Sequence, residues 1–238
     1  MTTRDPGVGA RRAVLALTSH DTLGDTGRHT GAYMSEVVDA WEVLTAAGYD
    51  VHLTSVLGGR PPLEAVDEAD PRHRAFLDDP TMRSRLANTR RAGELDPADY
   101  ALVFVAGGHG AAWDLPDDAG LAALIRGVYE TEGVIAAVCH GPAALVNVRL
   151  SDGSYLVEGR QVSSFSNDEE RAVGMTGIVP FLLADKLTER GAKYVSAPSF
   201  IPYVVADGRL VTGQNPPSAT AVAQRAVELL DQSLSNTL

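Results

Sequence analysis

The sequence predicts an α/β fold: a three-layer, flavodoxin-like sandwich in which helices cover both faces of a mostly parallel sheet. Two observations support this prediction. Short apolar runs recur along the 238-residue chain, and segments in which apolar residues recur at helical spacing lie between them. Because strands that alternate with helices form right-handed βαβ units, their sheet is parallel and covered on both faces. One domain of this length can bury a full core.

The expected strands are apolar runs of the length and composition of strands buried on both faces. They lie at Ala13–Thr18, Val51–Ser55, Ala101–Ala106 and Val134–Val138.

The expected helices have apolar residues three and four positions apart. The first runs over Met34–Ala47 and ends before Gly48, the second is opened by Asp117 and ended by Gly133, and the last spans Ser218–Leu230.

Two stretches interrupt this alternation. Residues 57–98 are rich in Pro, Asp and Arg, so we expect an excursion from the core that forms a small cap, with a helical piece near Arg72–Arg91. Residues 153–165 predict a small β-hairpin that turns near Gly159. We expect residues 1–12 to be a flexible tail, which leaves one domain over residues 13–238.

Composition excludes some classes of function. The chain has 20 basic and 31 acidic residues and a formal charge of -11, a field that repels nucleic acid. No apolar run approaches the roughly 20 residues that cross a bilayer. Arg11 and Arg12 precede an apolar stretch shorter than the about 7–15 residues of an export signal, so we expect a cytoplasmic protein.

The single cysteine, Cys139, follows a buried strand and precedes Pro142, a residue favoured in the first turn of a helix. Small residues, Ala137 and Gly141, stand two positions away on either side. This is the steric pattern of a nucleophile elbow, the tight turn between a strand and a helix that exposes a nucleophile. A helix beginning there would lower the pKa of the thiol. The pattern therefore favours a reactive cysteine over an inert buried one.

A glycine-rich loop follows the strand that ends at Ala106. Gly107 and Gly108 let backbone N–H groups approach a ligand closely, and the loop lacks the lysine of a phosphate-binding loop. We expect Gly107, Gly108, His109 and Gly141 to bind the substrate or a developing oxyanion beside Cys139. For His109 a structural role remains an equal alternative.

Three motifs together resemble the DJ-1/PfpI superfamily, which has the class I glutamine-amidotransferase-like fold, and within it the Hsp31-like glyoxalase III branch. They are Ala137–Pro142, Gly107–Pro116 and Leu210–Pro216. The resemblance extends over roughly residues 12–232. It implies a cysteine enzyme that acts on small reactive carbonyls.

The resemblance also implies the roles of four residues. The Cys-His-acid triad would be Cys139, His140 and Glu170, with Glu169 as the alternative acid. A carboxylate on the first long helix, Glu36, would stand near the thiol. A buried carboxyl group beside a cysteine should have a raised pKa and could move protons.

These residues lead to three hypotheses of function. The first is glutathione-independent conversion of methylglyoxal to lactate, or related deglycation. The second is another cysteine-dependent hydratase or hydrolase of small molecules, suggested by Ala184, where the branch has an acid, and by the apolar segment Ser196–Tyr203. The third is a stress chaperone or redox sensor, since an exposed cysteine oxidises readily. We expect no metal, no cofactor, no membrane contact and a homodimer.

Overall fold

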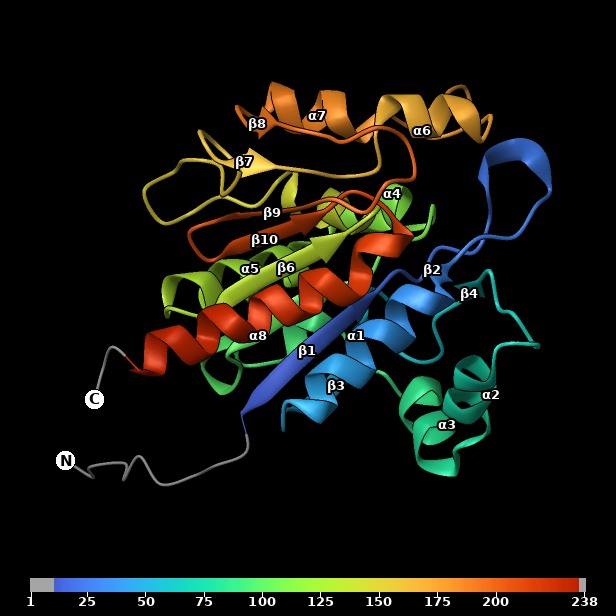
Figure 1. The fold of residues 1–238 in the computed structure, drawn as a ribbon, viewed down its shortest axis with the longest axis horizontal. Helices are drawn as coiled ribbons and strands as arrows, with labels where there is room; N and C mark the ends of the chain where they lie inside the picture. The colour runs from blue at the N-terminus through green and yellow to red at the C-terminus, as the bar shows by residue number, and fades with distance from the viewer. Residues whose placement is uncertain (1–10, 236–238) are drawn as a thin grey trace.

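The computed structural model describes residues 11–235, and its centre is a six-stranded sheet (Figure 1). The strand order is β3-β1-β5-β6-β10-β9, and every neighbouring pair is parallel except β10 and β9. The strands are β1 (Arg12–Leu17), β3 (Asp50–Ser55), β5 (Leu102–Val105), β6 (Val134–Val138), β9 (Val204–Asp207) and β10 (Leu210–Gly213).

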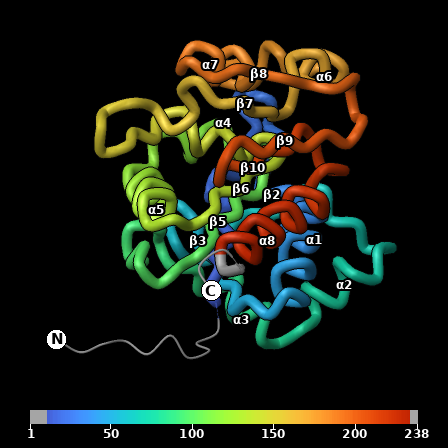
Figure 2. The backbone as a smooth tube through the Cα atoms, turned by 60° about the vertical axis from the view of Figure 1, so that its left-hand side comes forward, coloured from blue at the N-terminus to red at the C-terminus, as the bar shows by residue number. Residues whose placement is uncertain are grey.

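Helices cover both faces of this sheet. Figure 2 shows α1 (Met34–Ala46) and α8 (Ala219–Ser235) on one side and α5 (Ala119–Glu130) on the other. Successive residues of one strand enter opposite cores, because Leu15 packs with the α1 and α8 side and Val14 with the α5 side. The three-layer α/β architecture expected from the sequence is therefore confirmed.

Shorter elements surround this frame. The remaining helices are α2 (Pro71–Asp78), α3 (Pro80–Ala87), α4 (Ala111–Asp114), α6 (Asn167–Ala172) and α7 (Leu183–Glu189). Two small parallel pairs join β2 (Ala32–Tyr33) to β4 (Leu63–Glu64) and β7 (Gln161–Val162) to β8 (Lys193–Tyr194). Short 3-10 helices lie at Gly24–Thr26, Ala92–Glu94, Pro97–Asp99, Leu115–Asp117, Gly141–Leu145 and Pro216–Ser218.

The hairpin predicted at residues 153–165 is wrong. Glu158 and Arg160 donate backbone hydrogen bonds to the carbonyls three residues earlier, which makes turns, and β7 pairs in parallel with β8. Leu156 and Val157 are both fully buried, so this stretch lacks the alternation of a strand with one exposed face. The sheet's own hairpin is β9–β10, which turns at Gly208 with φ 59°.

The excursion expected at residues 57–98 holds α2 and α3, and the Asp79-Pro80 step divides what we expected to be one helical piece. These helices pack against α1, where the rings of Trp41 and Phe76 form a T-shaped contact with centroids 5.9 Å apart. The expected tail at residues 1–12 lies almost entirely outside the described residues, and β1 already begins at Arg12. No helix among residues 11–235 is long and apolar enough to cross a membrane.

Candidate active site

Cys139 lies at the carboxyl end of β6 in a strained backbone conformation. Its φ is 59°, in the left-handed region that residues with a Cβ rarely adopt. Its two glycine neighbours are required by packing. A Cβ at Gly141 would lie 2.3 Å from the carbonyl oxygen of Val105, and one at Gly107 would lie 2.8 Å from the Cβ of Cys139. The nucleophile elbow expected from the sequence is present.

The segment after the elbow differs from the sequence prediction. Gly141–Leu145 forms a single 3-10 helix, with Pro142 in its first turn, and no α-helix begins there. This segment lacks the aligned peptides that would give a long helix its dipole. No helix dipole therefore stabilises a thiolate here, and any such stabilisation has to come from individual backbone N–H groups.

Cys139, His140 and Glu170 form a connected triad. The Sγ of Cys139 lies 3.4 Å from Nδ1 of His140, whose Nε2 lies 2.9 Å from Oε2 of Glu170. All three side chains are buried. The sequence alternative, Glu169, points elsewhere: its carboxylate accepts hydrogen bonds from the backbone N–H groups of Ser166 and Phe200. The carboxylate that contacts His140 in this geometry is that of Glu170.

Charge and burial determine the protonation state of His140 and which ring nitrogen carries its proton. Burial, and then the neighbouring His109, lower the pKa of His140, so this ring is neutral at pH 7. Burial alone would raise the pKa of Glu170, but hydrogen bonds from both histidines lower it to about 2. An ionised Glu170 accepts the Nε2–H of His140. The Nδ1 of His140 then carries the lone pair and faces the thiol, as a general base must.

Glu36 is a second buried acid beside the thiol. Its Oε2 accepts a 2.6 Å hydrogen bond from the backbone N–H of Gly107, while Oε1 has no hydrogen-bond partner among the described residues. Burial raises the pKa of Glu36 to about 8, so the carboxyl group holds a proton at neutral pH. A carboxyl group with one unengaged oxygen and a pKa close to neutrality can both donate and accept a proton.

The expectation of a lowered thiol pKa is wrong for the resting site. Burial, followed by the charge of Glu36, raises the pKa of Cys139, and the backbone N–H groups of Gly108 and His140 offset only part of this effect. The raised pKa of both acids leaves the neutral pair dominant at pH 7. The thiol therefore needs a base when it reacts, and Nδ1 of His140 is the base within reach.

The buried Glu36 predicts a cost in stability that grows with pH. An acid whose pKa is raised from 4.5 to about 8 on folding releases its proton first from the unfolded chain, so stability falls between those pH values. We expect Glu36→Gln to raise the free energy of unfolding by on the order of 4 kcal/mol at pH 8, at about 1.4 kcal/mol per pKa unit. Urea unfolding at pH 5 and pH 8 measures this, and an equal gain at both pH values would contradict it.

The glycine loop directs its N–H groups to different partners. The N–H of Gly107 is used by Glu36, and the N–H of His109 donates to Oε1 of Glu64 at 2.9 Å. Gly108, with φ 99°, lies so close to Gly31 that a Cβ there would come within 2.0 Å of the Gly31 carbonyl oxygen. The N–H groups of Gly108 and His140 remain directed at the thiol.

His109 forms a second branch on the triad acid. Its Nε2 lies 3.1 Å from Oε1 of Glu170 and its Nδ1 lies 3.8 Å from Oε1 of Glu64. Burial alone would lower the pKa of His109, but the two carboxylates raise it to about 9. Glu64 was missed by sequence reasoning, because it lies in the irregular excursion and reaches the site through the pairing of β4 with β2. Thr30 holds its second oxygen at 2.7 Å.

A cavity of about 470 Å³ opens above the thiol. Acidic and apolar residues both line it: Tyr33, Ser35, Asp39, Glu64, Gly108, His109, Cys139, Phe165, Val173, Phe200, Pro216 and Pro217. Of the apolar segment Ser196–Tyr203 only Phe200 contributes, and Ala184 is buried in α7 away from the cavity. The cavity thus joins the nucleophile, its charged neighbours and an apolar wall.

One cluster in the described part of the chain has the donor atoms of a metal site. Ligand atoms of His109, His140 and Glu170 lie within 4.8 Å of one another. In this geometry, however, the Nε2 atoms of both rings are directed at the Glu170 carboxylate as hydrogen-bond partners. The same atoms complete the triad, so we assign them to proton handling.

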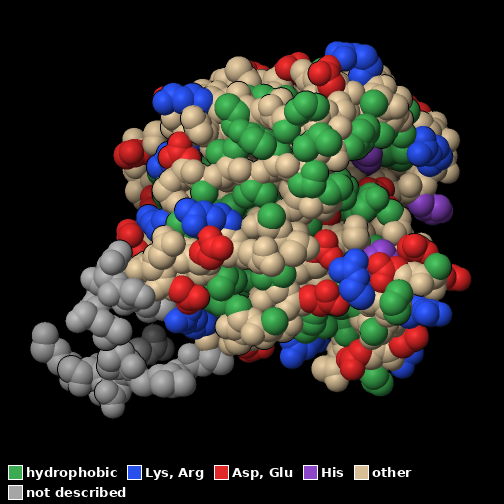
Figure 3. All heavy atoms as spheres, viewed as in Figure 1, with side chains coloured by type: hydrophobic (Ala, Val, Ile, Leu, Met, Phe, Trp, Pro, Cys, Tyr) green, Lys and Arg blue, Asp and Glu red, His purple; other side chains and the backbone are tan. Residues whose placement is uncertain are grey.

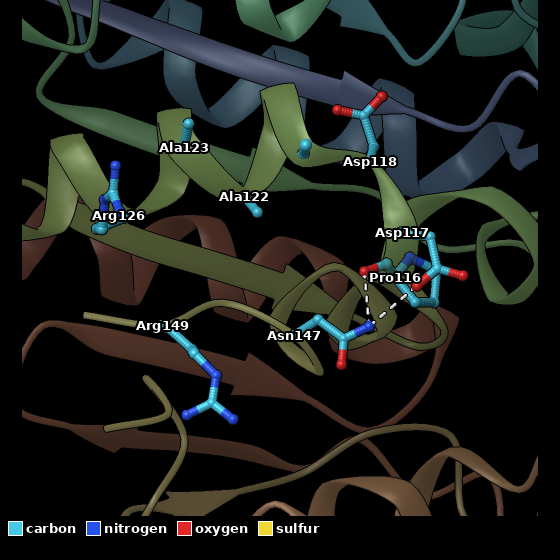
Figure 4. Close-up of a pocket in the computed structure, with 9 residues that line it drawn as sticks. Pro116, Asp117, Asp118, Ala122, Ala123, Arg126, Asn147 and Arg149 are labelled. Carbon is cyan, nitrogen blue, oxygen red and sulfur yellow. Dashed lines mark hydrogen bonds between the residues drawn. The ribbon is translucent and has the colours of Figure 1, made fainter. Parts of the chain in front are cut away.

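A second hollow of about 410 Å³ lies apart from this chemistry, between α5 and the segment around Asn147 (Figure 4). There Asn147 donates to the carbonyl of Pro116 and to Asp117, while Arg126 and Arg149 line its rim. It shares no lining residue with the cavity over Cys139.

Comparison with known proteins gives consistent matches. The model of the DJ-1/PfpI family matches residues 29–229. Glyoxalase 3 of Candida albicans is 32% identical over 228 residues, which cover 91% of this chain and 97% of that protein. The glutathione-independent glyoxalase HSP31 of Saccharomyces cerevisiae is 30% identical over 236 residues, which cover 92% and 98% of the two chains.

Two solved structures share the fold over nearly their full length. The 24 kDa Rapid Encystment Protein of Francisella tularensis has a TM-score of 0.89 at 35% identity, covering 92% of this chain and 99% of that one. Glyoxalase III of Candida albicans has a TM-score of 0.86 at 29% identity, covering 92% and 97%.

Proposed function

The chain belongs to the DJ-1/PfpI family, and from this premise we propose that it is a glutathione-independent glyoxalase that converts methylglyoxal and water to lactate. The observation that supports this most is the placement of two proton-handling groups around one thiol. Nδ1 of His140 lies 3.4 Å from Sγ, and the buried Glu36 keeps one oxygen unengaged beside it. An isomerisation needs both a nucleophile and a separate acid–base group.

The first step joins the substrate to the enzyme. Nδ1 of His140 takes the thiol proton as Sγ of Cys139 bonds to the aldehyde carbon, C1, and the carbonyl electrons move to its oxygen. The N–H groups of Gly108 and His140 stabilise the oxyanion. Protonated Glu36 then gives its proton to that oxygen, which leaves a hemithioacetal and an ionised Glu36.

The second stage moves a hydrogen between carbons. Ionised Glu36 removes the proton on C1 to give an enediolate and then delivers a proton to C2, while the C1 hydroxyl proton passes to the neighbouring oxygen. The product is a lactoyl thioester of Cys139. Water adds to the thioester carbonyl while ionised Glu36 takes one of its protons, and the sulfur leaves with the proton held by Nδ1 of His140. This releases lactic acid and returns Cys139, His140 and Glu36 to their starting protonation states.

The decisive test is an assay of the purified full chain with methylglyoxal in the absence of glutathione. We expect lactate to accumulate in proportion to enzyme, with one lactate formed for each methylglyoxal consumed. Loss of methylglyoxal without lactate would overturn the proposal, because it would show trapping by thiols or amines and no isomerisation.

The triad acid gives a further prediction. We expect Glu170→Gln to lower kcat/KM by about 10²-fold, because an amide N–H facing Nε2 of His140 would force the ring proton onto Nδ1, where it blocks the base. The matched control is Asp168→Asn, which changes an exposed acid in the same helix turn. Equal activity of the two variants would remove Glu170 from the triad.

The proposal extends to location and assembly. A thiol that must stay reduced suits a reducing compartment such as the cytoplasm. A homodimer remains our expectation, which light scattering of the purified chain measures directly.

A further inference from the structure

The apolar wall of the cavity is larger than a three-carbon substrate requires. Its volume of about 470 Å³ falls within the about 300–1,000 Å³ typical of sites for drug-sized ligands. Its apolar lining includes Phe165, Val173, Phe200, Pro216 and Pro217. Two of these side chains are exposed to an unusual degree for large apolar residues, Phe200 at 46% and Val173 at 39%. Apolar surface at the mouth of a cavity is suited to an apolar ligand group.

Phe200 is held at this wall against its own backbone preference. Its φ is 63°, in the left-handed region that a bulky side chain avoids. Such a conformation persists only where the surroundings determine it, and it is typical of functional positions. The Phe200 and Phe165 rings form a T-shaped contact, with centroids 6.4 Å apart.

The surroundings that hold Phe200 centre on Glu169. Its Oε1 accepts a 2.7 Å hydrogen bond from the Phe200 N–H and a 2.9 Å bond from Nδ2 of Asn215. Its Oε2 accepts from the N–H and the hydroxyl of Ser166, and Asn215 also donates to the carbonyl of Ile201. Glu169 and Asn215 are completely buried. This network fixes the loop, because breaking any of the four hydrogen bonds to the buried carboxylate would leave a buried polar group without a partner, at a cost in free energy.

We propose that Phe200, positioned by Glu169, makes this site selective for α-oxoaldehydes that carry an apolar substituent larger than methyl, such as an aryl group. The inference rests on the proposed glyoxalase reaction. The aldehyde carbon bonds to Cys139, and the substituent on the neighbouring ketone carbon lies against Phe200, Val173 and the two prolines. The chemistry is unchanged, so phenylglyoxal and water give mandelate.

The first experiment compares kcat/KM for phenylglyoxal and methylglyoxal in initial-rate assays of wild type and Phe200→Asn. Asparagine tolerates a positive φ and removes only the aromatic wall. We expect the ratio of phenylglyoxal to methylglyoxal kcat/KM to fall by at least ~10-fold, mainly through KM, as lost apolar contact usually does. Ile201→Asn is the matched control, since Ile201 is exposed beside Phe200 but does not line the cavity.

Glu169→Gln tests the positioning. It places an amide against the donors of Ser166, so the loop should shift, KM for phenylglyoxal should rise and kcat for methylglyoxal should stay within ~2-fold of wild type. An equal loss of kcat for both substrates would instead make Glu169 a general structural residue and overturn its positioning role.

A last measurement separates failure of this inference from failure of the glyoxalase proposal. The rate at which N-phenyliodoacetamide alkylates Cys139, divided by the rate for iodoacetamide, measures whether the apolar lining binds a phenyl group. This measurement needs no turnover. Preference for the phenyl reagent that disappears in Phe200→Asn supports the wall even if neither aldehyde is converted, in which case the glyoxalase proposal alone falls. If methylglyoxal is converted but Phe200→Asn changes neither the kcat/KM ratio of the two aldehydes nor the ratio of the two alkylation rates, the glyoxalase proposal stands and the proposed selectivity is wrong.

Discussion

Replacing Cys139 by serine is expected to lower kcat/KM for methylglyoxal by at least ~10³-fold. A serine hydroxyl fills almost the same space but is a far weaker acid and nucleophile than a thiol, so it adds to the aldehyde much more slowly with the same base. The hemithioacetal, which every later step requires, would not form. Lactate formation from methylglyoxal, followed at several enzyme concentrations, measures the effect.

The control for this variant is its fold. Circular dichroism and the unfolding midpoint of Cys139→Ser should match wild type, since Cys139 has no covalent partner and donates its backbone N–H to the carbonyl of Gly213 in either case. A folded serine variant with near wild-type activity would sink the covalent mechanism and leave Glu36 as the sole catalyst.

Glu36→Gln should lower the rate of lactate formation by at least ~10²-fold, in line with the usual contribution of a general base. Glutamine can still accept the N–H of Gly107, but it cannot take a proton from C1 or return one to C2. The bond between Sγ and the aldehyde carbon needs only Nδ1 of His140 as base, and water can protonate the resulting oxyanion in place of Glu36, so hemithioacetal formation and alkylation of Cys139 should persist. Mass spectrometry of the alkylated protein, alongside the lactate assay, separates these two steps.

The matched control is Glu42→Gln, a half-exposed acid on the same helix, which should keep full activity. Because Glu36→Gln is also expected to be the more stable protein, lost activity could not be ascribed to unfolding. Lactate formation at the wild-type rate in Glu36→Gln would show that another titratable side chain on the cavity wall, such as His109 or Tyr33, moves the proton.

Sequence reasoning found the frame and the strained turn at Cys139 because both depend on local patterns. Each of the four expected strands is present, and the elbow around Cys139 follows from the small residues at Ala137 and Gly141. Strands β9 and β10 were not predicted. Each is only four residues long, so the apolar pattern is short, and the turn at Gly208 separates the two.

The rest of the site depends on contacts that no local pattern contains. Glu64 comes from an irregular segment and reaches His109 only because β4 pairs with β2. The thiol pKa was predicted with the wrong sign because the sequence revealed neither the depth of burial of Cys139 nor the proximity of Glu36. Glu169 and Glu170 are adjacent in the sequence but point in different directions: Glu170 contacts His140, and Glu169 accepts a hydrogen bond from the N–H of Phe200. Only the geometry of the helix decides which of them faces His140.

The excursion between residues 57 and 98 has one more consequence, for the solution behaviour of the sheet. A parallel strand at the edge of a sheet presents unpaired backbone groups to which another chain can add. β3 is such an edge strand, and the returning excursion meets it there: Ser55 donates its N–H to the carbonyl of Arg90, and the Thr54 hydroxyl does the same at 2.6 Å. The chain thus blocks one end of its own edge strand and gives a second molecule fewer backbone groups from which to start aggregation.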